Sequence, residues 1–266
     1  MKRITWISNL LVAAGLLVGG GARAAGPSAG EIAKKIRDLN AGYGDLSAKV
    51  EMKLENAQGQ ATTRKLRIRS LEQPDPKVGD YSIVIFDSPR DVRGTALLSH
   101  AGVGSADQQW LYLPALKRVK RISSSRKTGA FLGSEFTYED ITGNEAAKYE
   151  WKRLGDGKCP ASAGKCYQLE TRPKDSESGY SRRVIWVEQK SYRIEKIDFF
   201  DKANKLQKTL NYEDFKQYKG KYWRAHRWVM KNHQSGKKTV LTFDKFSFGN
   251  GFSAGDFSKA ALERIK

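Results

Sequence analysis

The sequence predicts a mainly β protein with a single domain, a barrel or sandwich of antiparallel strands. Three observations predict it. Apolar and polar residues alternate with a period of two in several segments, short turn sequences separate the segments, and helical periodicity is confined to the chain ends. Clear turn sequences occur at residues 201–204, 219–220 and 235–236. No linker rich in Pro, Gly or Ser divides the chain, so we expect one domain.

The first 25 residues have the composition of a secretory signal peptide. Lys2 and Arg3 precede an apolar stretch over residues 4–21. Ala22-Arg23-Ala24 then has small residues at the two positions that a signal peptidase recognises. A membrane anchor is the alternative, but two polar residues interrupt the stretch. No cysteine lies near the cut, which argues against a lipid-anchored form. We therefore expect a signal peptide at residues 1–25, a mature domain at 26–266 and a periplasmic location.

One helix is expected to open the mature domain. Ser28 precedes Glu31 by three residues, which is the spacing of a capping box. Ile32, Ile36 and Leu39 then recur on one helical face. A second, short helix is expected at the C-terminal end, over residues 256–264.

The first two strands have one apolar and one charged face. Over residues 49–55, Val50, Met52 and Leu54 alternate with charged residues, and over residues 65–69, Leu66 and Ile68 alternate with basic ones. A turn at residues 56–60 joins the two as a hairpin. Further strands are expected at residues 81–86, 95–100, 109–113, 117–122, 147–154, 166–172, 182–188, 192–200, 206–215, 222–231 and 239–248.

A long non-strand segment, residues 123–143, interrupts this series, and we call it the insert. Its first part is polar, whereas Phe131, Leu132, Phe136 and Tyr138 crowd into its second part. Such a cluster of large apolar side chains must be buried somewhere. It could form a lid that plugs a cavity, or it could be ordinary core packing.

The two cysteines, Cys159 and Cys166, both belong to the mature domain. Export to an oxidising compartment favours a disulfide between them, which would staple a turn between two strands. A two-cysteine metal site is the alternative, but no histidine lies nearby in the sequence. We therefore expect a disulfide and no metal site.

The chain is strongly basic, with a formal net charge of +19, which favours anionic partners. Export argues against nucleic acid as that partner. The densest basic run is Lys117, Arg118, Lys120 and Arg121, which could contact a phosphate head group or an acidic surface of a partner. A solvated strand face is the alternative interpretation of this run.

Sequence motifs of enzymes are not evident. The chain has no Gly-x-Ser-x-Gly elbow, no His-Glu-x-x-His and no phosphate-binding loop. Its histidines are His100, His226 and His233, and the last two are seven residues apart in a strand-like region, which places them on opposite faces. We expect neither catalysis nor a cofactor.

Three motifs and the C-terminal end together resemble a known family. They are Phe86-x-x-Pro89-x-Asp91-x-x-Gly94-Thr95, Trp110-Leu111-Tyr112-Leu113-Pro114-Ala115-Leu116-Lys117-Arg118, Gly133-Ser134-Glu135-Phe136-Thr137-Tyr138-Glu139-Asp140 and the terminal Phe257-Ser258-Lys259-Ala260-Ala261-Leu262. In this order they resemble the LolA-like outer membrane lipoprotein-sorting protein family. Its members are periplasmic and often accompany transporters of the RND/MMPL type.

This resemblance implies a single unclosed antiparallel β-barrel, with a few short helices that cap or fill its concave face. It also implies a hydrophobic cavity that carries acyl chains of a lipid or lipoprotein towards the outer membrane, in a monomeric protein. An alternative is a lipid-sensing regulator or an accessory subunit of an RND-type transporter. The residues expected to line the cavity are Val50, Met52, Leu54, Leu66, Ile68, Trp110 and Tyr112, although ordinary core under a helix is possible for the first five. Under this hypothesis the lid comprises Phe131, Leu132, Phe136 and Tyr138.

Overall fold

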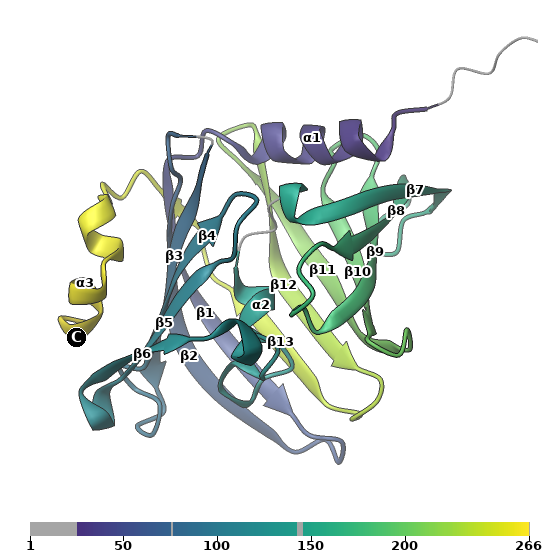
Figure 1. Ribbon diagram of the computed structural model, residues 1–266. Coiled ribbons are helices and arrows are strands. Elements are labelled where there is room, and N and C mark those ends of the chain that lie inside the picture. Colours follow the sequence, from purple (N-terminus) through teal and green to yellow (C-terminus); the bar gives the residue numbers. More distant parts are fainter. Residues whose placement is uncertain (1–25, 76, 143–145, 266) are drawn as a thin grey trace, which may run out of the picture.

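The computed structural model describes residues 26–75, 77–142 and 146–265, so the expected signal peptide lies outside the described residues. The chain is mostly β (Figure 1). The strands of its N-terminal half are β1 Asp45–Glu55, β2 Ala61–Leu71, β3 Val78–Ser88, β4 Ala96–Gly102, β5 Gln108–Leu113 and β6 Arg118–Ile122. Those of its C-terminal half are β7 Tyr149–Lys158, β8 Lys165–Pro173, β9 Tyr180–Glu188, β10 Ile194–Asp201, β11 Leu206–Tyr218, β12 Tyr222–Asn232, β13 Lys238–Phe243 and β14 Ser247–Phe248.

All strands belong to one antiparallel sheet that curves without closing. The order is β6-β5-β4-β3-β2-β1-β13-β12-β11-β10-β9-β8-β7, and β14 pairs with β1 beside this path. Neighbours along the chain pair as hairpins on each side, and the β1–β13 pair joins the two halves. The edges β6 and β7 are not neighbours in this order. The sheet is therefore an open barrel, as expected.

The alternation in β1 and β2 produces the concave wall. In the β1–β2 register, Val50 lies opposite Leu66 and Ala48 opposite Ile68. Val50 also lies opposite Phe243 of β13, so apolar side chains of three adjacent strands share one face. The charged residues of both strands point to the other face because successive side chains of a strand alternate.

Within the described residues three α-helices accompany the sheet: α1 Ala29–Asn40, α2 Tyr138–Ile141 and α3 Lys259–Glu263. The predicted capping box is present, since the side chains of Ser28 and Glu31 each accept from the other's backbone N–H. Helix α1 crosses one mouth of the barrel, and α2 lies inside its curve (Figure 1). In the part of the chain that the structure describes, no helix is both long and apolar enough to cross a bilayer.

Two of the expected elements are broken. The expected strand 239–248 is two strands, β13 and β14, with residues 244–246 between them outside the ladder. The expected helix 256–264 is a 3-10 turn, Ala254–Phe257, followed by α3. The break is at Ser258, whose extended backbone cannot continue a helix and whose hydroxyl caps α3 by accepting from the Ala261 N–H.

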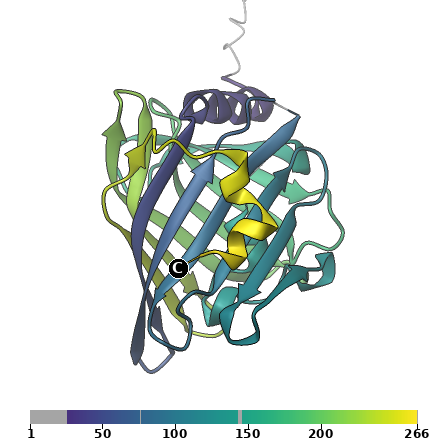
Figure 2. The same cartoon turned by 90° about the vertical axis from the view of Figure 1, so that its left-hand side faces the viewer.

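The sheet has a hydrophobic core on each face. The main core fills the concave side and includes side chains from α1, the insert and both halves of the sheet. A smaller core lies on the convex side of β3–β6, where Phe257 and Leu262 of the C-terminal segment cover Ile83, Ile85 and Leu98. Figure 2 shows this segment crossing the outside of the strands.

Candidate functional site

The concave wall brings together five of the residues expected to line a cavity. Val50, Met52 and Leu66 are buried in the main core, and Leu54 and Ile68 pack against it while partly exposed. Met52 lies opposite Leu241 in the β1–β13 register. These side chains therefore form one continuous apolar surface. Other parts of the chain cover this surface in the structure.

Trp110 and Tyr112 do not belong to this wall, and that expectation was wrong. Both lie on the convex face, in the smaller core under the C-terminal segment, whereas Leu111 between them belongs to the main core. The error has a simple cause. The segment Trp110-Leu111-Tyr112 is apolar on both faces because both faces are covered, so alternation alone does not indicate which side is concave.

The aromatic residues of the insert cover the concave wall. Phe131 and Phe136 are each 1% exposed, and Leu132 and Tyr138 pack against the same core. Phe131 contacts Phe86 of β3 and Tyr138, with ring centroids 5.7 Å apart in each pair. The four expected lid residues thus lie together inside the barrel, and the described part of the insert, residues 123–142, contains no strand of the sheet.

A buried ion pair joins the insert to the opposite wall. The Lys208 Nζ of β11 lies 2.6 Å from Asp140 Oδ2, and the two side chains are only 3% and 6% exposed. The same ammonium donates to the Glu135 carbonyl at 3.0 Å. Tyr180 of β9 donates its hydroxyl hydrogen to Asp140 Oδ1 at 2.9 Å, and burial together with Asp140 raises the pKa of Tyr180 well above its ordinary value. The network satisfies a carboxylate that would otherwise be costly to bury.

Further contacts of the insert also use side chains rather than a strand ladder. Asn232 of β12 donates to Glu135 Oε2 at 2.7 Å, and the Glu135 backbone N–H donates to Thr239 Oγ1 of β13 at 3.0 Å. Arg64 of β2 donates to the Leu132 carbonyl. Such contacts can be exchanged without breaking backbone pairing of the sheet.

Lys208, Asp140 and Tyr180 were not predicted to form a site. Asp140 was visible within the family motif, but nothing in the sequence connects it with a lysine 68 residues later. A lysine within a strand is ordinarily a solvated residue, and only the curve of the sheet brings this one against the insert.

The open seam of the barrel contains a cavity of about 390 Å³ that is lined by charged, polar and apolar residues. The ends of β5 and β7 and the β4–β5 and β8–β9 loops line it, and ion pairs Lys127–Asp175 and Lys148–Asp107 lie in its lining. Glu139 of α2 also lines the seam; burial raises its pKa while its Oε1 accepts from the Gly179 N–H at 2.9 Å. The seam is therefore closed by polar contacts rather than by strand pairing.

The basic run lies at the exposed edge strand β6 and the turn before it. Lys117, Arg118, Lys120 and Arg121 are all exposed, and none has a salt bridge within the described residues. Lys120 lies opposite Leu111, whereas Arg121 lies opposite Trp110, so the two point to different faces of the edge. Charges on an edge strand also discourage pairing with other strands. The four basic residues therefore lie along one exposed edge of the sheet and point to both of its faces, so they do not form one flat basic patch.

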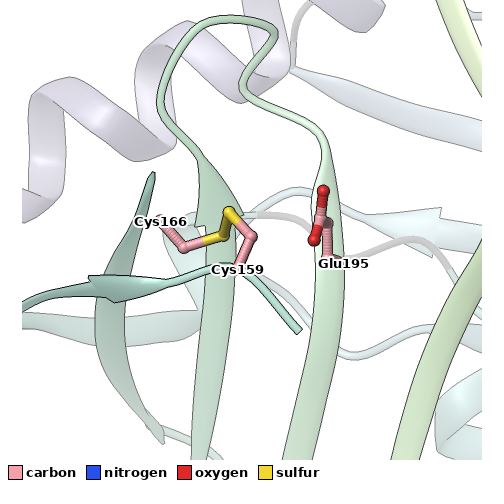
Figure 3. A group of neighbouring side chains, drawn as sticks. All are labelled: Cys159, Cys166 and Glu195. Carbon is pink, nitrogen blue, oxygen red and sulfur yellow. A yellow bond between two sulfur atoms is a disulfide. The ribbon is translucent and has the colours of Figure 1, made fainter. Parts of the chain in front are cut away.

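The expected disulfide between Cys159 and Cys166 is present at the β7–β8 hairpin, with a Cα–Cα distance of 5.0 Å. Glu195 of β10 lies beside it (Figure 3), and all three side chains are buried. The sulfurs are bonded to each other, and Glu195 accepts from the Ala161 N–H and pairs with Arg193 at 3.1 Å. The group is thus a disulfide-bonded turn beside Glu195, whose carboxylate already has a hydrogen-bond donor and a cation as partners.

Comparisons with known proteins agree with this architecture. A crystal structure from Vibrio parahaemolyticus, described as an outer membrane lipoprotein-sorting protein domain, is 46% identical to this chain with a TM-score of 0.85. The match covers 88% of this chain and 97% of that one. The chain belongs to the LolA-like outer membrane lipoprotein-sorting protein family. A family model described only as an uncharacterized protein matches residues 79–264.

Two further solved structures are similar to this member of the LolA-like family. A DUF1329 family protein from Desulfovibrio piger is 29% identical with a TM-score of 0.80, covering 87% of this chain and 96% of that one. A LolA superfamily protein from Nitrosomonas europaea has a TM-score of 0.69 at 21% identity, covering 88% and 99%, and supports the fold alone. A search of curated proteins finds no match.

Proposed function

We propose that this LolA-like protein is a periplasmic carrier that shelters acyl chains of a lipid or lipoprotein inside its open barrel and transfers them towards the outer membrane. The observation that carries the proposal is the insert, whose apolar side chains cover the concave wall and whose polar contacts with the sheet described above each involve a side chain rather than a strand ladder. A covering of this kind can leave without unravelling the barrel.

The physical requirement is burial of hydrocarbon. Each methylene removed from water contributes about 0.8 kcal/mol, so one long acyl chain costs on the order of 10 kcal/mol to expose. The wall formed by Val50, Met52, Leu54, Leu66 and Ile68 supplies apolar surface for that chain once Phe131 and Phe136 move away. In the empty protein the same aromatic side chains protect the wall from water.

The Lys208–Asp140 pair acts as the fastening of this lid. Both charges are desolvated in the closed state, where the cost of removing them from water offsets much of their attraction. Opening rehydrates both groups, so the difference between the closed and open states is smaller than the contacts alone suggest. A cargo that supplies apolar contacts to the wall can then favour the open state.

We propose the periplasm as the compartment of this protein. Residues 1–25 are proposed as a cleaved signal peptide, and residues 26–266 as the carrier domain. In the periplasm the disulfide at Cys159 and Cys166 is stable, which supports that location. A monomer suffices for a carrier of this design because the whole wall comes from one chain.

Lipid extraction tests the proposal. The protein is purified from the periplasm of expressing cells and extracted with organic solvent, and the extract is analysed by mass spectrometry. A stoichiometric lipid, together with binding of a fluorescent fatty-acid probe to the delipidated protein, is the expected result. Absence of both lipid and probe binding would overturn the carrier function.

A further inference from the structure

A second cavity lies at the mouth of the barrel, beneath the C-terminal half of α1. Its volume is about 210 Å³, and we call it the α1 cavity. Apolar side chains of α1, β10, β11 and β12 line it; they include Ile36, Leu39, Tyr212, Phe215, Trp223 and Trp228. No aspartate or glutamate lines it among the residues that the structure describes.

The packing of α1 explains why space remains there. In the first half of the helix, Ile32 is fully buried, with 0% exposure. Ile36 and Leu39, further along the same face, stay partly exposed and border the cavity, although Ile36 also packs against the edge of the main core. The helix thus seals the mouth at one end and leaves an apolar space at the other.

Three cations surround this apolar space, and they differ in how far they are neutralised. Arg193 pairs with the buried Glu195 and stacks over the Phe215 and Trp223 rings at 4.8 and 5.2 Å. The disulfide-bonded turn helps to hold that pair, since Glu195 also accepts from the Ala161 N–H. Arg193 therefore brings little uncompensated charge.

Arg224 has no such carboxylate. Its Nη1 donates to Asn40 Oδ1 and to the Trp223 carbonyl, both at 2.9 Å, and no salt bridge to it occurs in the described part of the chain. Its guanidinium lies over the Tyr43, Tyr222 and Phe248 rings. Burial lowers the pKa of Arg224, which is the sign of a cation held where water solvates it poorly.

Lys221 adds a second cation without a carboxylate at the same rim. Its ammonium donates to the Ala41 carbonyl, directly after α1, and no acidic partner for it is present within the described ranges. Arg224 is desolvated whereas Lys221 is exposed, and both lack a carboxylate partner, so each can form a charge-assisted hydrogen bond with an anionic ligand. Apolar walls below and two cations without carboxylate partners at the rim match an amphiphile with one anionic head.

We propose that the α1 cavity is the head-group site of the cargo, and that it binds amphiphiles whose head is a carboxylate or a phosphate. This inference rests on the proposed carrier function and narrows its substrate class. The head contacts Arg224 and Lys221, and the first methylenes of the chain lie between α1 and the β11–β12 aromatic side chains. The rest of the chain continues towards the concave wall.

The test uses four probes with the same twelve-carbon chain: laurate, dodecyl phosphate, dodecyl maltoside and dodecyltrimethylammonium. Their binding to delipidated protein is measured by calorimetry below the concentrations at which they form micelles. Both anionic probes should bind about tenfold more tightly than the neutral and cationic ones, the effect of one charge-assisted hydrogen bond. Arg224→Gln should remove most of this preference without weakening maltoside binding, and Arg224→Lys should restore part of it.

Controls separate charge at the site from overall charge and from misfolding. Arg90→Gln removes the same charge at an exposed position outside the cavity and should keep the preference. Leu39→Glu places a carboxylate at the half-exposed rim and should also abolish the preference, so the proposal remains testable if the Arg224 variants fold poorly.

Other outcomes overturn the inference in distinguishable ways. Equal binding of all four probes, or an anionic preference that persists in both Arg224→Gln and Leu39→Glu, overturns the head-group site but leaves the carrier function standing. Inorganic phosphate that binds as tightly as dodecyl phosphate shows a site for free anions, which also overturns it. No binding of any probe overturns both proposals.

Discussion

Lys208 of β11 and Asp140 of the insert form a nearly solvent-free ion pair, 2.6 Å long, across the inside of the barrel. This ion pair joins the insert, which covers the concave wall, to β11. Because neither group is solvated in the closed state, each depends on the other, and the position of the insert is linked to the electrostatics of one contact.

Removing one partner of this pair should release the insert. In Lys208→Met the apolar stem is kept, but Asp140 is left buried without its cation, which typically costs about 3–5 kcal/mol. We expect a lower free energy of unfolding and faster amide hydrogen exchange in residues 123–142 than in β1 and β2. The double variant Lys208→Met with Asp140→Leu should recover much of the stability. An unchanged exchange rate in the insert of the single variant would contradict its role as a fastening.

A lid and a permanent core respond differently to truncation. Phe136→Ala should lower the free energy of unfolding by about 3–5 kcal/mol, as for any buried phenylalanine, yet bind a fluorescent fatty acid more tightly because less lid surface must be displaced. Phe257→Ala, in the convex core and equally buried, is the matched control. It should lose stability without a gain in affinity. Weaker probe binding by Phe136→Ala would favour ordinary core packing.

Glu139 gives the seam a pH dependence with a defined sign. Burial raises the pKa of Glu139 in the folded protein above 4.5, the ordinary value for a glutamate. The folded state therefore holds this proton more tightly than the unfolded state. Its stabilising contribution is complete below pH 4.5 and is lost as the pH rises through the raised pKa, at up to about 1.4 kcal/mol per pH unit. The stability advantage of Glu139→Gln over the wild type should therefore grow with pH across that window. Chemical denaturation at several pH values measures this difference in stability, and a difference that stays constant with pH would contradict the prediction.

The exposed basic edge should bind anionic membrane surfaces. Replacing Lys117, Arg118, Lys120 and Arg121 by glutamine should weaken sedimentation with phosphatidylglycerol vesicles, by about 1 kcal/mol per residue at low salt. A variant that replaces four exposed lysines of the β7–β8 side, Lys152, Lys158, Lys165 and Lys174, has the same charge. If both variants lose affinity equally, overall charge rather than this edge accounts for binding.

Most of the sheet could be predicted from local patterns. The alternation at Val50 and Met52 and at Leu66 indicated strands with one buried face, and the structure places those side chains in one core. The pairing of Cys159 with Cys166 followed from their short separation and from export. These features are visible because alternation and loop closure act over a few residues.

The remaining features depend on contacts between distant segments. The face of Trp110 could not be predicted, since both sides of its strand are covered by parts of the chain that lie far away in sequence. The curvature of the sheet brings Lys208 next to Asp140 and places Arg224 at the α1 cavity. Curvature brings strand ends and loops together in ways that residue spacing does not encode.

Photochemical labelling tests most directly whether hydrocarbon occupies the inside of the barrel. The protein is incubated with a fatty acid that carries a diazirine near the end of its chain, then irradiated and digested, and the adducts are located by mass spectrometry. We expect adducts on concave residues such as Met52, Leu66 and Met230, and we expect unlabelled fatty acid to suppress them by competition. Adducts confined to the convex face, or labelling that unlabelled fatty acid does not reduce, would contradict this expectation.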